Sequence, residues 1–364
     1  MNLGLVELRR TPGRFAAVAG AVGFIVFLAL ILAALSDGLY LGSTGAYRSS
    51  SAEIFVFSEG SGFELSGSTV TEEMADEVAE APGVGSVGRL SSFNTTATSE
   101  GADLQLTLLG ADEATMPSVL VDGRLPETGQ REVVIDQQTQ RRGLEIGSVI
   151  SVNDGPQLEV VGIAEDAGFG FTTAWTGHDV FQEVRAEVRP ELAGLEGTSQ
   201  ALGVSTSGEG AVDAVAALPG VEVATVQEAI DALPAASQQK STLDAIVYTT
   251  FTVAAIVVGL FFALITLEKR SEYAVLKAIG MSNLTLVWAL FSQAIVASLA
   301  GFVVGFGLSR LAGVLIPSDV PALFLTITAV TLLGITLVMG ALGAIFSFRR
   351  VVKIDPANAL GGAA

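Results

Sequence analysis

Two long uncharged runs, 245–267 and 284–308, enclose a short charged segment, and this pairing constrains the fold more than any other feature. Each run has enough apolar residues to cross a bilayer, which needs about 20. The segment between them, 268–283, begins Glu-Lys-Arg-Ser-Glu-Tyr. It must therefore lie at one membrane surface. The pattern predicts an α-helical membrane protein.

Two further runs, 15–35 and 321–348, are also apolar, and 50% of all residues in the chain are hydrophobic. We therefore expect four transmembrane helices. The first run could instead be a signal peptide, because Ala34-x-Ser36 resembles a cleavage site. It is longer than a usual signal-peptide core and follows several arginines, so we interpret it as an uncleaved helix.

Basic residues are concentrated in three short pieces of the chain, 1–14, 268–283 and 349–364, which hold nearly half of all Lys and Arg. The positive-inside rule predicts that these pieces are cytoplasmic. Both termini then lie inside, residues 36–244 form an extracytoplasmic domain, and 309–320 form a short outer loop. The expected localisation is the cell membrane, with several passes.

The formal net charge is −19, and most of the acidic residues fall in the predicted outer domain. A solvated acidic surface explains this charge, and a cation-binding surface is the alternative. The chain has no cysteine, which excludes disulfides and thiolate metal sites. No metal site is expected.

The region 36–244 is predicted to be a large α+β domain that begins with a helical extension over 36–51. A helix–Pro–Gly–strand pattern occurs twice, at Pro82-Gly83 and at Pro219-Gly220. It indicates either an internal repeat or a coincidence in a chain rich in Ala, Val and Gly. The strands expected within 131–163 favour a small, separate β subdomain.

Motifs for catalysis are missing from the sequence. It contains no Gly-x-x-x-x-Gly-Lys-Ser/Thr phosphate loop, no Gly-x-Ser-x-Gly elbow and no His-Glu-x-x-His site. We expect the single histidine, His178, to lie in a solvated loop. Gly301-x-x-x-Gly305 predicts a close helix contact, with homodimerisation as the alternative. The chain is therefore predicted not to be an enzyme, and its energy must come from another subunit.

The charged segment resembles the cytoplasmic coupling helix of the FtsX-like permeases, the membrane subunits of MacB- and LolC-type ABC transporters. Their pattern is Glu-Arg-x-x-Glu-Ile-Gly-x-Leu-Lys-Ala-hydrophobic-Gly, from which this chain departs at Lys269, Tyr273 and Ala274. The ending Asp355–Leu360, with the pattern Asp-Pro-x-x-Ala-Leu, and the amphipathic start of the chain are also similar. So is the layout of one helix, a large outer domain and three more helices. The resemblance implies that these residues contact an ATPase: Glu268, Glu272, Tyr273, Leu276, Lys277 and Gly280.

As a helix, this segment would place Glu268 and Glu272 one turn apart, beside an aromatic and apolar row. Gly280 suits the end of such a helix, and Ser282 or Asn283 suits the start of the next. The alternative is a charged loop that only fixes the topology.

The resemblance implies a homodimer in the lipid bilayer, bound to two copies of a separate cytoplasmic ABC ATPase that hydrolyses ATP with Mg²⁺. No cofactor of its own and no nucleic-acid partner are expected. Family members are described as mechanotransmitting, so helical stalks over 36–51 and 231–244 would carry motion to the outer domain.

The cargo is suggested by residues Ala34–Leu39, where the first transmembrane helix is expected to leave the membrane. This segment looks similar to that of the haem-exporting permeases of Gram-positive bacteria. Alternatives are an exporter of lipid, peptide or antibiotic, or a signal transmitter that regulates an extracytoplasmic cell-wall hydrolase. An interfacial aromatic belt would equally explain the tyrosines, and a helix-end charge the aspartate. The candidate substrate-binding residues are Asp37, Tyr40, Tyr47 and Tyr248.

Overall fold

The computed structural model describes residues 12–170, 172–195, 197–208, 210–268, 272, 275, 279–317 and 320–352. The chain divides into two compact units. The helical unit comprises Met1–Asp37, Ser241–Pro317 and Ala322–Ala364, and the α/β unit comprises Gly38–Lys240 and Ser318–Pro321. Most of the predicted N-terminal arm and the tail beyond Val352 lie outside the described residues.

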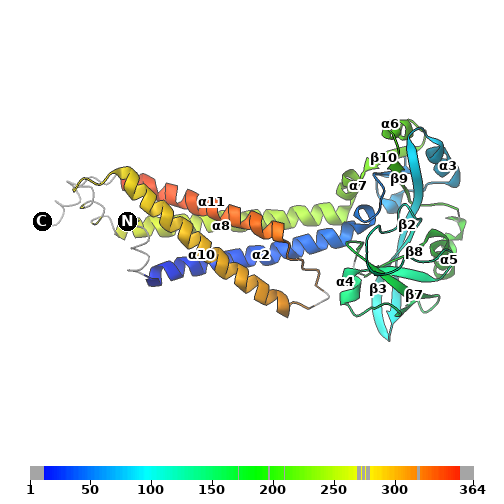
Figure 1. Cartoon of the computed structure of the whole chain (residues 1–364), viewed down its shortest axis with the longest axis horizontal. Coiled ribbons are helices and arrows are strands. Elements are labelled where there is room, and N and C mark those ends of the chain that lie inside the picture. The colour runs from blue at the N-terminus through cyan, green and yellow to red at the C-terminus, as the bar shows by residue number, and fades with distance from the viewer. Residues whose placement is uncertain are drawn as a thin grey trace. The chain divides into compact units, whose positions relative to one another are not determined.

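The helical unit is built from long helices (Figure 1). These are α2 (Pro12–Arg48), α8 (Pro234–Glu268), α10 (Asn283–Leu315) and α11 (Thr326–Val352). The part of α2 from Gly38 onward and the part of α8 up to Lys240 belong to the α/β unit. Among the described residues, three helices are long and apolar enough to cross a membrane, over Phe15–Arg48, Leu284–Leu315 and Thr326–Gly343. The fourth predicted span, 245–267, lies within α8, where several side chains fall outside the described set.

Two predicted boundaries differ from the structure. Helix α10 continues to Leu315, well past the expected end at residue 308. Helix α11 begins at Thr326 because the preceding residues lie along α2, where the Leu323 backbone N–H donates to the Ala34 carbonyl at 2.9 Å. The predicted outer loop therefore begins later than the sequence indicated.

Small residues let the helices of this unit approach closely. A Cβ atom added at Gly301 would lie 2.6 Å from Val22 Cγ1, and one at Gly305 would lie 2.5 Å from the Gly23 carbonyl oxygen. The predicted close helix contact is therefore confirmed, and its partner is α2 of the same chain. Because α2 covers this glycine face, the face is not free to bind a second copy.

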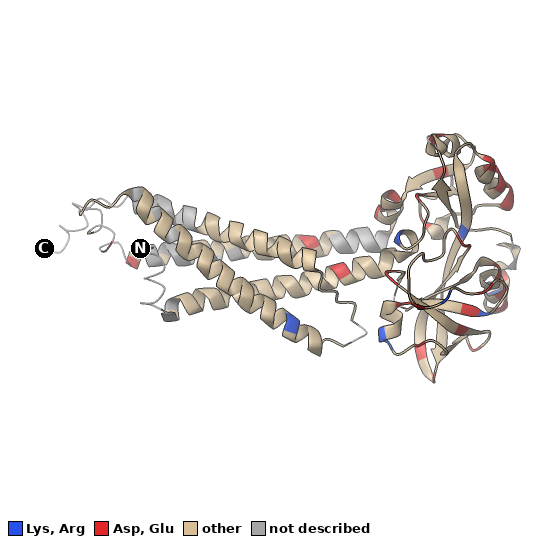
Figure 2. Cartoon of the chain, in the orientation of Figure 1, with Lys and Arg blue, Asp and Glu red and all other residues tan. Residues whose placement is uncertain are grey.

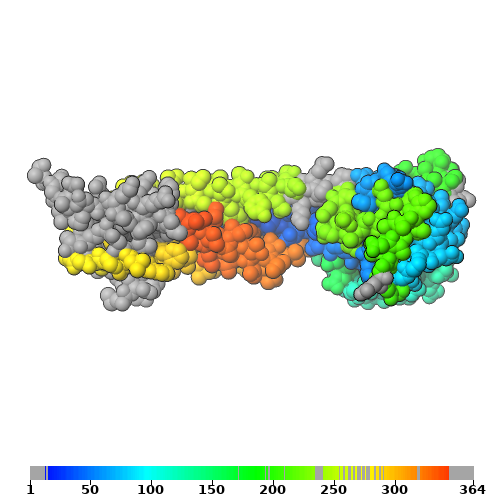
Figure 3. All heavy atoms as spheres, turned by 90° about the horizontal axis from the view of Figure 1, so that it is seen from above, coloured from blue at the N-terminus to red at the C-terminus, as the bar shows by residue number. Residues whose placement is uncertain are grey.

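The interior of the helical unit is apolar. Helices α8 and α11 lie side by side (Figures 1 and 3), and a Cβ added at Gly259 would lie 3.8 Å from Gly343 Cα. Residues of α2 at helical spacing form one side of a buried cluster with side chains from the other three helices. The α2 members are Phe15, Val18, Val22, Val26, Ala29, Leu30 and Ala33.

The α/β unit is organised around one ten-stranded sheet in the order β10-β1-β9-β2-β3-β8-β5-β7-β4, with β6 paired to β2 and β7. Short helices cover it (Figure 1). The strands are β1 (Ile54–Ser58), β2 (Val84–Ser99), β3 (Ala102–Ala111), β4 (Leu120–Gly123), β5 (Glu132–Asp136), β6 (Val149–Val152), β7 (Gln157–Ala164), β8 (Thr172–Gly177), β9 (Ala201–Thr206) and β10 (Val221–Thr225). The helices are η1 (Leu65–Gly67), α3 (Glu72–Glu80), α4 (Gln137–Arg141), α5 (His178–Val188), η2 (Pro190–Leu195), α6 (Ala211–Ala216) and α7 (Val226–Ala232).

The two Pro–Gly segments adopt the same local form. Each ends a helix, α3 or α6, and each starts a strand, β2 or β10. Gly83 and Gly220 both have positive φ, +82° and +77°, a conformation that side chains other than glycine rarely tolerate. Val78 of α3 and Val215 of α6 are buried in one apolar cluster. The repeated helix–turn–strand pattern is therefore present in the structure.

The prediction of a separate β subdomain over 131–163 is wrong. β5 joins the common sheet through β8, with Val134 opposite Trp175, and β6 pairs with β2, with Val152 opposite Ala97. These strands do have their own buried cluster. The local pattern could not show that β8, which follows them in the chain, would bridge β3 and β5.

The part of α2 from Gly38 to Arg48 belongs to the α/β unit, where direct backbone contacts hold it, and the predicted helical extension reaches Arg48. The Gly45 N–H donates to the Gly168 carbonyl at 2.8 Å, and the Gly170 N–H donates to the Gly42 carbonyl at 2.9 Å. A Cβ at Gly45 would lie only 2.5 Å from Gly168 backbone atoms. We call this contact the stalk joint.

We predict that Gly45→Ala destabilises the protein by about 1–3 kcal/mol, because the added methyl overlaps backbone that cannot rotate away. Gly42→Ala should cost less, since its new contact, at 2.9 Å, is with the mobile end of the Gln138 side chain. Gly20→Ala on the same helix meets nothing within 4 Å and is the matched control. Thermal unfolding of the purified full chain measures all three, and equal midpoints would contradict the stalk joint.

Candidate functional site

The charged segment between α8 and α10 is described only at some positions. Glu268 ends α8, Glu272 and Val275 are helical, and the Ile279 N–H donates to the Val275 carbonyl at 3.0 Å. Gly280 has φ +94°, as expected of the glycine that ends a helix. The remaining predicted contact residues, Tyr273, Leu276 and Lys277, lie outside the described residues.

The next helix starts as the sequence predicted. Ser282 has extended backbone and its side-chain oxygen accepts from the Thr285 N–H, so it is the N-cap of α10. The segment is thus bounded by a helix-ending glycine and a capping serine, which fixes the turn between it and α10.

One face of the charged segment is open. Val275 is 47% exposed, Ile279 is 73% exposed, and Glu272 is also exposed. Because these positions are spaced by three and four residues, they share one helix face. Two exposed apolar side chains beside a carboxylate can dock into an apolar groove with a polar rim on a partner protein.

Two of the candidate cargo residues belong to the helical unit. Asp37, on α2, accepts a hydrogen bond at Oδ2 from Thr328 Oγ1 of α11, at 2.6 Å. Tyr248, on α8, is 67% exposed. Its ring is therefore accessible at the helix surface.

The other two candidates belong to the α/β unit. Tyr47 is 1% exposed, and its ring packs edge-on against Phe55 at 4.8 Å and near Phe169. Its hydroxyl has no hydrogen-bond partner among the described residues. Tyr40 is half-buried against the same cluster. A ligand could reach the Tyr47 hydroxyl only if this core opened.

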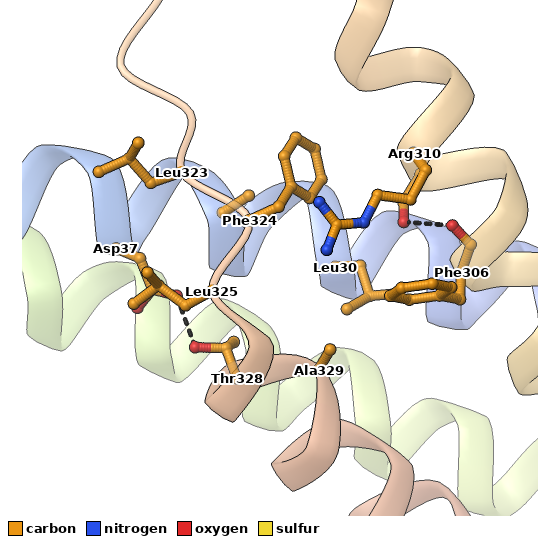
Figure 4. A pocket seen from close by; sticks show the side chains of 11 residues that line it. Leu30, Asp37, Phe306, Arg310, Leu323, Phe324, Leu325, Thr328 and Ala329 are labelled. Atoms are coloured by element: carbon orange, nitrogen blue, oxygen red, sulfur yellow. Dashed lines mark hydrogen bonds between the residues drawn. The ribbon is translucent and has the colours of Figure 1, made fainter. Parts of the chain in front are cut away.

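Arg310 was not among the predicted site residues, because it stands two residues beyond the uncharged run; it nevertheless belongs to α10. Its guanidinium carbon lies 5.2 Å from the centroid of the Phe306 ring and 5.5 Å from that of Phe324 (Figure 4). These residues line a pocket with Leu30, Asp37 and others, and the pocket has room for about one water molecule. The sequence did contain a sign of this contact: an arginine follows a phenylalanine by four residues, a spacing that brings two side chains together on a helix.

The prediction of a solvated loop for His178 is wrong. His178 is the first residue of α5 and is 1% exposed, because Phe181 and Val184 of that helix pack against the sheet. Its Nε2 lies 3.2 Å from Ser91 Oγ, and its Nδ1 has no partner among the described residues. Because the residues next to it in the sequence are polar, the sequence did not indicate that it belongs to the buried face of a helix.

Burial lowers the pKa of His178 from 6.5 to about 4, and the positive charge of Arg89 adds to this. Asp112 and Asp179 act in the opposite direction, and Arg185 lowers the pKa further. Asp112 is itself held by Arg89 through an ion pair of 2.8 Å. The imidazole is therefore neutral in the folded protein at neutral pH.

We predict that the buried His178 makes the protein less stable as the pH falls from about 6.5 towards 4. Below 6.5 the unfolded chain takes up a proton that the folded chain excludes, so the loss approaches about 1.4 kcal/mol per pH unit. His178→Gln should flatten this part of the profile, whereas Ser91→Ala, which keeps the histidine, should not. Unfolding midpoints between pH 7.5 and 4.5 test this, and identical slopes for His178→Gln and wild type would contradict it.

These features define a membrane protein with a large α/β domain inserted after its first helix. Residues 15–233 match the family model of the MacB-like periplasmic core domain, and residues 245–356 match the FtsX-like permease C-terminal model. The first match covers more than half of the chain, so the chain belongs to the FtsX-like permeases with a MacB-like periplasmic core domain. It is an ABC transporter permease, and membership of this family implies an ATPase partner.

Similar proteins span the whole chain. An uncharacterized ABC transporter permease of Mycobacterium tuberculosis (strain ATCC 25618 / H37Rv) is 29% identical over 349 residues, 94% of each chain. A Staphylococcus epidermidis protein named as the permease HrtB of a hemin transport system is 22% identical over 367 residues, 100% of this chain and 99% of that one.

Two solved structures resemble part of the chain. The extracellular domain of the transporter YknZ from Gram-positive bacteria is 17% identical with a TM-score of 0.36, covering 47% of this chain and 99% of that one. The periplasmic region of MacB from Actinobacillus actinomycetemcomitans is 12% identical with a TM-score of 0.39, covering 50% and 92%. No functional conclusion follows from scores of this size.

Proposed function

We propose that this chain is the membrane subunit of a mechanotransmitting ABC exporter, which works as a homodimer with two copies of a separate cytoplasmic ATPase. The charged segment 268–280 carries this proposal, because it presents Glu272, Val275 and Ile279 on one exposed face between two long apolar helices. Together with both termini it lies in the cytoplasm, as its basic residues favour. The partner hydrolyses ATP with Mg²⁺, and this chain needs no cofactor.

The motion reaches the α/β unit through continuous helices. α2 runs unbroken from Pro12 to Arg48, and the stalk joint holds its end by backbone hydrogen bonds at Gly42 and Gly45. A helix fixed in this way moves as one piece with the residues it is bonded to. Closure of the ATPase pair displaces the charged segments, and the helices carry that displacement to the extracytoplasmic side.

We further propose that the cargo is a hydrophobic molecule such as haem, taken from the membrane. The whole-length similarity to a protein named for hemin transport supports this. So does the exposed ring of Tyr248 on the helical unit, since phenolate oxygen is a known ligand of haem iron. Asp37 supplies a carboxylate on the same unit. Tyr47 is excluded from this role by its burial in the closed core.

We predict that Glu272→Gln combined with Leu276→Ala uncouples the transporter. The family resemblance assigns both residues to the ATPase contact, so transport-linked ATPase activity should fall by about tenfold or more. A matched control is Glu77→Gln with Val212→Ala, which removes an exposed carboxylate and an exposed valine from the α/β unit. Normal ATP-driven activity in the first pair would contradict the docking role.

We predict that haem added to the purified full-length protein shifts its absorption band on binding. Asp37→Asn with Tyr248→Phe should abolish the shift, because both oxygen ligands are removed. Tyr47→Phe, which deletes only a buried hydroxyl without a partner among the described residues, should leave the shift intact. An unchanged spectrum with the wild-type protein would rule out haem as the cargo.

A further inference from the structure

Arg310 is the only charged residue of α10, which is otherwise uncharged over its whole length (Figure 2). It is exposed, and Val303 and Val314, which share its helix face, are 62% and 81% exposed. The helix ends five residues later, at Leu315, about 7.5 Å further along the axis. The arginine therefore lies on an exposed apolar stripe near one end of a helix long and apolar enough to cross a membrane.

The guanidinium is held in place by aromatic rings rather than by acids. Figure 4 shows it between Phe306, on its own helix, and Phe324, from the segment before α11. Both rings attract the cation through their faces. Among the described residues, no carboxylate forms an ion pair with Arg310 and no acceptor takes a hydrogen bond from its side chain.

An arginine in the membrane region is costly unless an anion or water reaches it. The neighbouring carboxylate, Asp37, already accepts from Thr328 and forms no ion pair with Arg310. Aromatic packing restricts the guanidinium, so little conformational entropy is lost when it binds an oxyanion through its N–H edge.

We propose that Arg310, clamped by Phe306 and Phe324, binds the phosphate of a membrane phospholipid. Its N–H groups donate to two phosphate oxygens, a geometry that suits arginine better than lysine. The adjoining pocket has room for about one water molecule, so the acyl chains lie outside it, along the exposed apolar surfaces of α10 and α11. On α11 this surface includes Ile327 and Val330, which are 70% and 58% exposed.

This site goes beyond cargo export, since it ties α10 and the segment before α11 to the lipid surface. Phe306 and Phe324 come from different elements, so a phosphate bound by Arg310 favours the arrangement in which both rings contact the guanidinium. The same guanidinium could bind free inorganic phosphate, and the experiment below separates the two sources.

The test measures lipid binding to the purified full-length protein by native mass spectrometry, with dioleoyl-phosphatidylglycerol, dioleoyl-phosphatidylcholine and dioleoylglycerol as probes. Both phospholipids should bind more tightly than dioleoylglycerol, which lacks phosphate. Arg310→Gln should weaken phosphatidylglycerol binding by about tenfold. Arg310→Lys should bind phosphatidylglycerol with an affinity between those of the wild type and Arg310→Gln, because lysine keeps the positive charge but cannot donate two parallel N–H bonds. Phe324→Leu should also weaken binding, and Arg141→Gln, which removes an exposed arginine of the α/β unit, should not.

The outcomes separate this proposal from the others. Unchanged phosphatidylglycerol binding in both Arg310→Gln and Arg310→Lys, or equal binding of dioleoylglycerol, would overturn it. Loss of lipid binding on adding millimolar inorganic phosphate would assign the site to free phosphate instead. If Arg310→Gln abolished the haem absorption shift but still bound phosphatidylglycerol, Arg310 would be assigned to cargo binding instead. If haem did not bind but lipid binding remained and depended on Arg310, the haem-cargo proposal would be contradicted and the lipid-site proposal would stand.

Discussion

The contact of α2 with the loop at Gly168 is the constraint on which the rest of the structure depends. Backbone meets backbone at Gly45, with no side chain between them that could change rotamer and absorb a displacement. The loop follows β7 and leads into β8, and β8 pairs with both β3 and β5. One helix end is thereby connected to the middle of a single sheet.

Features set by local sequence could be predicted. The apolar runs gave the long helices, Ser282 gave the start of α10, and the two Pro–Gly pairs gave matching turns, because each depends on residues adjacent in the chain. The unity of the sheet could not be predicted, since it depends on β8 and on the pairing of β6 with β2. The burial of His178 likewise depends on where a distant strand, carrying Ser91, packs.

The candidate sites also differ in whether they depend on residues adjacent in the chain or on residues far apart in it. The charged segment could be proposed from sequence because its residue pattern is contiguous, and Glu272 in it is exposed. The burial of Tyr47 could not be predicted, because its neighbours, Phe55 and Phe169, come from elsewhere in the chain. Arg310 was overlooked because a charge was taken to end a span, although aromatic rings accommodate it within the helix.

The glycine face of α10 also has a consequence for how the chain is made. Its partner on α2 surrounds Gly23, about 280 residues before Gly305. At about 5–20 residues per second, translation separates the two by roughly 15–60 seconds. During that interval α2 sits in the bilayer with its docking surface open to lipid, to the insertion machinery or to another nascent copy. The order of biosynthesis therefore requires the first helix to be stable alone before its permanent neighbour exists.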